Sequence, residues 1–251
     1  MTNIQLIEIA KKAAKAAGKE IIEIYETGDF SIEAKEDNSP LTIADQAAHN
    51  IIIQHLKETN LPVLSEEGRD IPYSERSAWN KFWMVDPLDG TKEFIKKNGE
   101  FTVNIALIEN QKPIHGVVYA PVLDKMYFTT DGGASMLEGE VETKLNSNPY
   151  EEIKNIVASR SHKSPETEEV LAKYPNAKVL SMGSSLKFML LAEGKAQLYP
   201  RFAPTMEWDT AAAHAVLSAL NYSVKNPEGQ ELRYNKENLL NPFFVAKGMK
   251  G

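Results

Sequence analysis

The amino-acid sequence predicts an α/β protein built as a layered α+β sandwich, with an antiparallel sheet in its N-terminal half and βα units in its C-terminal half. Its 251 residues, 42% of them hydrophobic and 25% charged, are typical of a soluble globular protein with a full core. Apolar and polar residues alternate along residues 101–120, which predicts paired strands. Beyond residue 150, strand-like and helix-like segments alternate, which predicts βα units.

The N-terminal half begins with an amphipathic helix. Apolar residues recur at three- and four-residue steps over Asn3–Glu26, and Gly28 follows as a stop signal. A second helix is expected over Thr42–Glu58, before the turn at residues 60–62. The strands expected in this half are Phe30–Ala34, Val63–Leu64, Phe82–Val85, Phe101–Leu107, Ile114–Ala120 and Lys125–Thr130. The second and third of these strands end next to acidic residues.

A polar stretch with few apolar residues, Glu138–Tyr150, is the best candidate for a domain boundary. We therefore expect an N-terminal half over residues 1–140 and a C-terminal half over residues 141–251. The elements expected in the second half are strands over Ile153–Ser159, Lys178–Met182, Ala196–Pro200 and Phe243–Lys247, and helices near Pro165–Lys173, Ser184–Glu193 and Glu207–Leu220.

Charge and cysteine content exclude several classes of function. A net charge of −7 gives no basic surface of the kind that binds a nucleic-acid polymer. The absence of cysteine excludes disulfides, iron–sulfur clusters, cysteine-zinc sites and a thiol nucleophile. The sequence opens without a secretory signal and holds no membrane-spanning apolar run, so we expect a cytoplasmic protein. It leaves open whether the protein is a monomer or a homodimer, and whether it associates peripherally with the inner face of a membrane.

Two aspartates surround a proline at the end of one predicted strand. Asp86 closes that strand, Pro87 is expected to turn the chain, and Asp89 follows before Gly90. Such a segment gathers carboxylates and carbonyls around one point, which suits a hard divalent cation. The alternative is an ordinary Asp-Pro and Asp-Gly turn between a strand and a helix.

Further acidic residues weaken that alternative. Glu66 and Glu67 follow another short strand, Asp45 lies in the first turn of one predicted helix, and Asp209 opens another. Each has an ordinary explanation as a solvated loop residue, a partner of the helix dipole or a helix cap. Taken together, they indicate one converging site.

These motifs occur in the order and rough spacing of the inositol-monophosphatase superfamily of magnesium-dependent, lithium-sensitive phosphatases, which the chain resembles over essentially its whole length. The motifs are Pro40–Asp45, Ser65–Glu67, Asp86–Thr91 and Glu207–Ala212. Other segments resemble the 3′(2′),5′-bisphosphate nucleotidase branch in particular. They are Lys92–Ile95, Asn98–Asn104, Ser159–His162, Gly183–Phe188 and Leu198–Phe202.

The resemblance implies an inositol-monophosphatase-like fold and two or three Mg²⁺ ions. The implied ligands are Glu66, Asp86 and the Leu88 carbonyl for one ion, Asp86, Asp89 and Asp209 for a second, and Glu67 and Asp45 for a third ion or its water. Electrostatics supports this independently, because so many carboxylates around an anionic phosphate need roughly two or three divalent ions to offset them.

The resemblance also implies the catalytic and substrate-binding groups. Thr91, paired with Asp45, would orient the attacking water, and Glu67 completes the expected catalytic set. The residues expected to contact the substrate are Glu66, Leu88, Asp89, Gly90, Thr91 and Asp209 around the transferred phosphate, and His162, Ser184, Lys187 and Arg201 around a second phosphate. The implied reaction is hydrolysis of 3′-phosphoadenosine 5′-phosphate (PAP) to AMP and phosphate; the alternative within the fold is an inositol monophosphatase.

Two other interpretations compete. A haloacid-dehalogenase-type phosphatase also carries an aspartate and an Asp-Gly-Thr, but its two aspartates are separated by one residue, whereas two residues separate Asp86 and Asp89. A non-catalytic Ca²⁺-binding or sugar-phosphate-binding module would need the carboxylates but not a positioned Thr91. Trapping of a covalent intermediate, together with a phosphate-release assay in Mg²⁺, separates the three.

Overall fold

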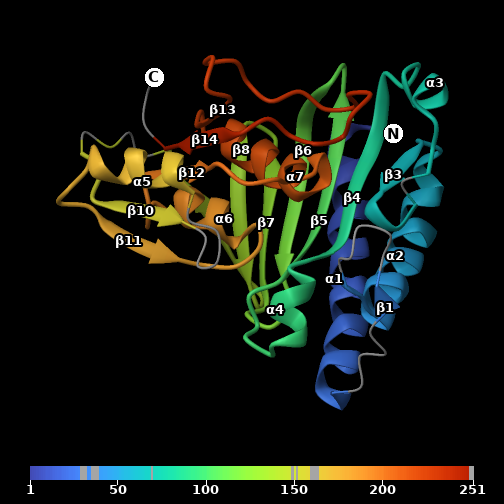
Figure 1. Ribbon diagram of the computed structural model, residues 1–251. Coiled ribbons are helices and arrows are strands. Elements are labelled where there is room, and N and C mark those ends of the chain that lie inside the picture. The colour runs from blue at the N-terminus through green and yellow to red at the C-terminus, as the bar shows by residue number, and fades with distance from the viewer. Residues whose placement is uncertain are drawn as a thin grey trace.

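The protein is described by a computed structural model, which covers residues 1–28, 33–34, 40–68, 70–147, 150, 152–158 and 164–248. Helices and sheets alternate in layers (Figure 1). Helices α1 (Asn3–Thr27) and α2 (Ile43–Leu56) cover one face of a seven-stranded sheet, and α7 (Glu207–Ala219) covers the other. A five-stranded sheet lies beyond α7 and α6 (Leu186–Ala192). The layered α/β fold that the sequence predicts is confirmed.

Both covering helices of the first layer begin with a capping box. Thr2 and Gln5 form the box of α1, and Gly28 ends that helix with a φ of 75°. Thr42 and Asp45 form the capping box of α2. The Thr42 side chain accepts a hydrogen bond from the Ala44 N–H, and the Asp45 side chain accepts one from the Thr42 N–H. The cap therefore fixes the Asp45 carboxylate at the start of α2.

The seven-stranded sheet has the order β3-β4-β5-β6-β7-β8-β9. Its strands are β3 (Val63–Ser65), β4 (Lys81–Asp89), β5 (Thr102–Glu109), β6 (Lys112–Ala120), β7 (Lys125–Thr130), β8 (Gly133–Glu138) and β9 (Val141–Leu145). β3 and β4 are parallel, and the other neighbours are antiparallel. β9 lies in the stretch expected to be a boundary, so the first sheet continues to Leu145, and the division at residue 140 stays a prediction.

The five-stranded sheet has the order β11-β10-β12-β14-β13 and is mixed. Its strands are β10 (Asn155–Ala158), β11 (Lys178–Ser181), β12 (Leu198–Arg201), β13 (Ser223–Lys225) and β14 (Phe244–Lys247). β10 runs parallel to β11 and β12, as βα units require, whereas β14 is antiparallel to β12 and β13. Helix α5 (Pro165–Ala172) joins β10 to β11.

The remaining elements are short. They are β1 (Glu33–Ala34), β2 (Pro40–Leu41), the 3₁₀ helices η1 (Lys57–Thr59) and η2 (Glu66–Gly68), α3 (Tyr73–Arg76) and α4 (Thr91–Ile95). Within the described ranges, no helix combines the length and the hydropathy needed to cross a bilayer.

The seven-stranded sheet and α7 approach each other closely at Gly116. A Cβ atom at that position would lie 2.2 Å from the carbonyl oxygen of Ala212, so β6 accepts only a residue without a side chain there. This contact, together with the apolar core between the layers, holds α7 against the sheet.

Candidate active site

Acidic residues from three elements meet at one end of the sheet. The parallel pairing of β3 with β4 ends where Ser65 lies opposite Val85, so the residues that follow, Glu66 and Asp86, come next to each other. α7 brings Asp209 to the same place. One carboxylate oxygen from each of Glu66, Asp86 and Asp209 lies within 4.8 Å of the other two. The structure thus brings together three of the expected metal ligands.

A bulge in β4 places Asp89 beside this cluster. Asp86 pairs with Asn104 of β5, and Asp89 pairs with Thr102, so β4 has one more residue than β5 over this interval. Residues three apart in a regular strand face opposite sides, and the extra residue returns Asp89 to the side of Asp86. The turn expected at Pro87 is therefore wrong: β4 continues through Pro87 to Asp89. The Leu88 N–H donates to Asp86 Oδ1 at 3.1 Å and stabilises the bulge.

The carboxylates repel one another in a buried setting. Asp86 is only 1% exposed; burial raises its pKa well above the usual value, and the charges of Glu66, Asp89, Asp209 and Asp45 raise it further. Burial likewise raises the pKa of Asp209, reinforced by Asp89 and Glu66 and opposed by the Met206 N–H. Asp86 is buried, and Glu66 and Asp209 are half-buried. An oxygen-only cluster of this kind fits one or more divalent cations such as Mg²⁺, whose charge would remove the repulsion.

Thr91 and Asp45 lie together, as the resemblance implies. Gly90, with a φ of 96°, leads into α4, and the Thr91 hydroxyl lies 3.3 Å from Asp45 Oδ1 and 3.3 Å from the Leu88 carbonyl oxygen. The other oxygen of Asp45 accepts from the N–H and the hydroxyl of Thr42, at 2.8 and 2.6 Å. Asp45 is therefore both part of a helix cap and an acceptor for the Thr91 hydroxyl, and its catalytic role stays a prediction.

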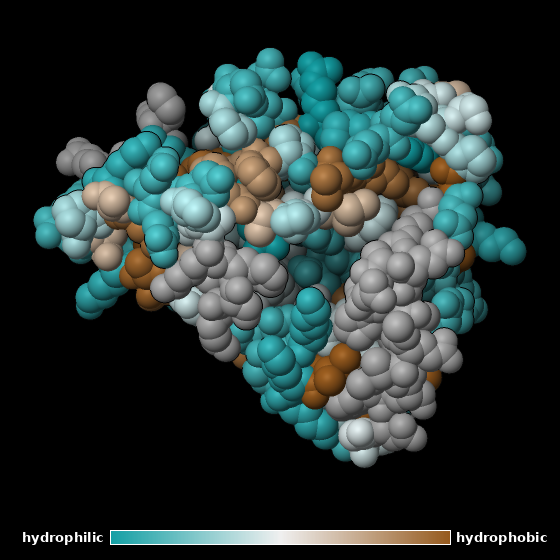
Figure 2. Space-filling model, in the orientation of Figure 1, coloured by the Kyte–Doolittle hydropathy of each residue, from teal (hydrophilic) through white to brown (hydrophobic). Residues whose placement is uncertain are grey.

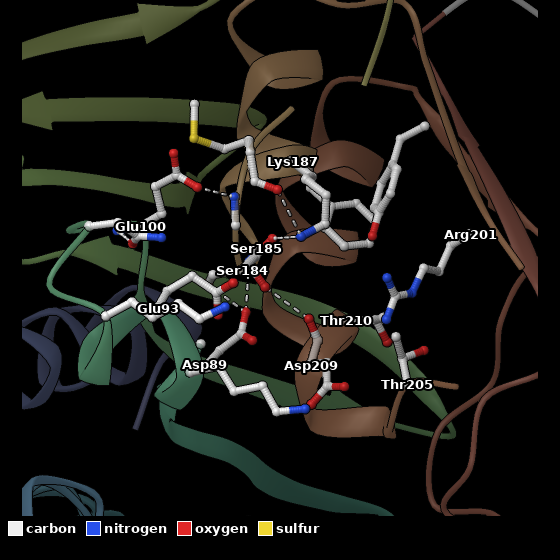
Figure 3. A pocket seen from close by; sticks show the side chains of 18 of the residues that line it. Asp89, Glu93, Glu100, Ser184, Ser185, Lys187, Arg201, Thr205, Asp209 and Thr210 are labelled. Atoms are coloured by element: carbon white, nitrogen blue, oxygen red, sulfur yellow. Dashed lines mark hydrogen bonds between the residues drawn. The ribbon is translucent and has the colours of Figure 1, made fainter. Parts of the chain in front are cut away.

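Ser184, together with Ser185, which the sequence does not single out, holds Asp89 in place. Asp89 Oδ2 accepts from the Ser184 hydroxyl and the Ser185 N–H, both at 2.6 Å (Figure 3). The Ser185 hydroxyl donates to the Asp209 carbonyl oxygen at 2.8 Å and accepts from Asn104 Nδ2 at 3.0 Å. The loop before α6 thus connects the segments that carry Asp89 and Asp209. Ser184, expected near a second phosphate, already donates to Asp89.

A pocket of about 440 Å³ opens beside the acidic cluster (Figure 3). Asp89 and Asp209 line it on one side, and Lys187 of α6 and Arg201 of β12 line it on another. The molecular face in Figure 2 is hollowed in the region between α4 and α7, with hydrophilic residues in the hollow. Asp89 therefore shares one cavity with Lys187 and Arg201, which lie 98 and 112 residues further along the sequence.

Two of the cationic residues that line the pocket, Lys187 and Arg201, differ in how many hydrogen bonds they already make within the protein. Lys187 is 8% exposed, and its Nζ donates to the carbonyl oxygens of Ser184 at 2.6 Å and Met182 at 3.4 Å. Burial lowers its pKa to about 8, although Asp89 opposes the shift. Arg201 donates from Nη2 to the Pro204 carbonyl at 3.1 Å, and its Nε is buried without a hydrogen-bond partner. Arg201 thus keeps an unused donor for an anion.

One expected site residue, Glu67, stands apart from the three-acid cluster, and another lies outside the described residues. Glu67 of η2 lies outside the three-acid cluster. It lies near His49, whose pKa is lowered by burial and raised, to a smaller extent, by the charge of Glu67. Nδ1 of His49 lies 2.9 Å from the Ser65 hydroxyl oxygen. His162 lies outside the described residues. The roles assigned to both stay predictions.

Comparisons with known proteins agree with this geometry. The pattern of the family described as "Inositol monophosphatase family" matches residues 3–245. The 3′(2′),5′-bisphosphate nucleotidase CysQ of Escherichia coli K12 is 49% identical over 236 residues, covering 92% of this chain and 95% of the relative. CysQ of Salmonella typhimurium is 47% identical over 244 residues, covering 95% and 98%. The crystal structure of CysQ from Bacteroides thetaiotaomicron superposes with a TM-score of 0.90 at 46% identity, covering 99% of each chain. The chain therefore belongs to the inositol monophosphatase family.

Proposed function

We propose that the protein is a Mg²⁺-dependent phosphatase that hydrolyses PAP to AMP and phosphate. The observation that carries the proposal is a three-carboxylate cluster beside a cavity whose other wall bears Lys187 and Arg201. The cluster suits the phosphate that is cleaved, and the cations suit a second phosphate that the cluster cannot reach. The similarity to CysQ nucleotidases supports this choice of substrate.

The residues that would hold the ions are the expected ones. Glu66, Asp86 and the Leu88 carbonyl would bind one Mg²⁺, and Asp86, Asp89 and Asp209 a second. When bound, the ions lower the pKa of the attacking water and stabilise charge on the leaving oxygen. A third ion near Glu67 and Asp45 belongs to the same proposal.

The chain's own groups orient the attack and receive the proton. Thr91 Oγ1 takes a proton from the attacking water as its own proton passes to Asp45 Oδ1, which lies 3.3 Å away and later releases it to solvent. The water oxygen forms a bond to phosphorus, the ester P–O bond breaks, and the 3′-oxygen of the ribose takes a proton from solvent. Arg201 holds the 5′-phosphate during the reaction.

A phosphate-release screen tests the substrate. With Mg²⁺ present, we expect PAP to be cleaved with a higher kcat/KM than inositol 1-phosphate or fructose 1,6-bisphosphate. A preference for inositol 1-phosphate would replace the proposal with the inositol monophosphatase alternative. Cytoplasmic location, the choice between monomer and homodimer, and peripheral membrane association stay predictions.

Removal of the metal should abolish activity. We expect chelation with EDTA to stop phosphate release, added Mg²⁺ to restore it, and Li⁺ or excess Ca²⁺ to lower it. Ca²⁺ tolerates irregular oxygen cages with longer bonds, so it would occupy the site without holding the octahedral geometry that Mg²⁺ imposes. Phosphate release with each ion, measured after dialysis against EDTA, checks this. Full activity in chelator would end the metal hypothesis.

Arg201→Ala should discriminate between substrates. The Arg201 side chain has an unused buried donor and a planar fork suited to phosphate, so its loss should weaken PAP binding by about 1.5–3 kcal/mol. Lys187→Met should have a smaller effect, because the Lys187 ammonium already donates to two carbonyls. Hydrolysis of inositol 1-phosphate should change little in either variant. Equal losses on both substrates would show that these residues do not recognise the second phosphate.

A further inference from the structure

A fully buried carboxylate begins the helix that carries Asp209, yet it does not join the acidic cluster. Glu207, the first residue of α7, is 0% exposed. Its Oε2 accepts from the Asn235 N–H at 2.5 Å, and its Oε1 accepts from the Lys236 N–H at 3.0 Å and from Lys236 Nζ at 2.5 Å. The backbone N–H of Glu207 donates to the Leu239 carbonyl at 2.9 Å. Glu207 is thus bound to the segment between β13 and β14, which passes over α7 in Figure 1.

The same segment is held from the other side by Arg76, which is buried at the end of α3, a few residues before β4. Arg76 Nη1 donates to Asn235 Oδ1 at 3.0 Å and to the Lys236 carbonyl at 2.6 Å, and Nη2 donates to the Glu237 carbonyl at 2.8 Å. Asn235 Nδ2 returns a bond to the Arg76 carbonyl at 2.7 Å. Residues 235–237 therefore join the start of α7 to the chain that leads into β4.

Helix capping does not account for Glu207. Asp209, the third residue of α7, already accepts a hydrogen bond at 2.9 Å from the backbone N–H of Met206, the N-cap residue of that helix. A buried carboxylate also has a desolvation cost that an apolar residue would not have. The hydrogen bonds from Asn235 and Lys236 offset that cost, and they fix the start of α7 against the repulsion between Asp209 and the carboxylates of Glu66 and Asp86.

We propose that Glu207 is a positioning residue that, with Lys236 and Arg76, clamps the first turn of α7 and sets the affinity of the site for Mg²⁺. Residues 207 and 209 are about 200° apart around the helix axis, so Glu207 faces the 235–237 segment while Asp209 faces β4. The clamp holds Asp209 within ligand distance of Asp86 and Glu66 against their mutual repulsion. The inference rests on the proposed function only in taking Asp209 as a metal ligand.

Glu207→Gln tests the clamp. Glutamine keeps the shape of the side chain, but its NH₂ group is a donor where the carboxylate has an acceptor oxygen. That NH₂ group would face an N–H or ammonium donor of Asn235 or Lys236, so at least one hydrogen bond would be lost. We expect the Kd for Mg²⁺, measured by calorimetry on the metal-stripped full chain, to rise about 10- to 100-fold, the range for loss of a group that orients a ligand. Half-maximal activity should need correspondingly more Mg²⁺, while kcat at saturating Mg²⁺ recovers most of its original value.

Glu231→Gln is the matched control. Glu231 accepts from the Val224 N–H and also contacts α7, through His214 Nε2 at 3.3 Å. His214 is five residues, more than one helical turn, beyond Asp209 on α7. Its loss should lower the melting temperature without changing the Kd for Mg²⁺. A second test variant, Lys236→Met, leaves Glu207 its two backbone donors and should raise that Kd several-fold.

The outcomes separate the inference from the proposed function. If Glu207→Gln and Lys236→Met lower the melting temperature but keep the original Kd for Mg²⁺, the clamp serves only stability and the inference is wrong. If Glu207→Gln does not fold, the Kd of Lys236→Met for Mg²⁺ alone decides whether the clamp affects metal binding. If the unmodified chain does not bind Mg²⁺, the proposed function fails before the clamp is tested.

Discussion

Asp209→Asn should remove most of the phosphatase activity and, at neutral pH, raise the melting temperature of the metal-free protein. The loss of one metal ligand should reduce kcat/KM by on the order of 10²-fold or more. The gain in stability follows from the pKa of Asp209, which burial and the charges of Asp89 and Glu66 raise in the folded state. The stabilising contribution of such a group is fully present below its unfolded pKa of roughly 4 and is lost as the pH rises through the folded pKa. Asparagine never ionises, so it avoids that loss while its side-chain oxygen still caps Met206.

Thermal melts in EDTA and in Mg²⁺ measure both effects. Mg²⁺ should stabilise the unmodified protein and should stabilise Asp209→Asn much less. Asp131→Asn, which removes the same charge from an exposed turn, is the control and should leave activity and Mg²⁺ binding unchanged. A large fall in the melting temperature of metal-free Asp209→Asn would contradict the repulsion described for the cluster.

Thr91→Ala should lower kcat by about 10²- to 10⁴-fold with little change in KM, because the hydroxyl acts on the attacking water and not on the bound substrate. Asp45→Asn should have a similar effect, because the amide cannot take up the proton that Thr91 passes on, whereas its side-chain oxygen can still accept from the Thr42 N–H. The double variant should lose little more than either single variant, since the two residues act as one unit.

Steady-state kinetics at saturating Mg²⁺ checks this pairing. Thr91→Ser keeps the hydroxyl and should retain most of the activity. If the losses of Thr91→Ala and Asp45→Asn multiply in the double variant, the proton path through Thr91 is wrong.

The convergence of Glu66, Asp86 and Asp209 could be predicted from the sequence, because each acid follows a short apolar strand or opens a helix and so has a defined place. The geometry of β4 could not. Asp-Pro in isolation favours a turn, and only pairing with Asn104 and Thr102 of β5 keeps the chain extended through a bulge. That pairing is a tertiary contact with no local signal.

The support around Asp89 escaped prediction for the same reason. Ser185 and Asp89 are 96 residues apart, and their hydrogen bond depends on how the α6 layer meets the sheet. The motif containing Ser184 could be recognised, but its local sequence does not say that the hydroxyl faces a carboxylate. Strand β9 was missed because it lies at the edge of the sheet with four of its five residues exposed, so it lacks the apolar alternation of a half-buried strand.

Most of the reaction centre belongs to the first layer, whereas part of the pocket wall comes from a different layer. Most of the carboxylates, with Thr91, come from α2, α4 and the ends of β3 and β4, and α4 also lines the pocket through Lys92 and Glu93. Lys187, Arg201 and Phe244 of the wall come from α6 and the second sheet. During evolution, mutations in the second sheet can therefore alter which phosphate ester is accepted while the hydrolytic chemistry stays intact. Diversification within such a fold should accordingly concentrate in the second sheet and α6, and the β3 and β4 strand ends should tolerate the least change.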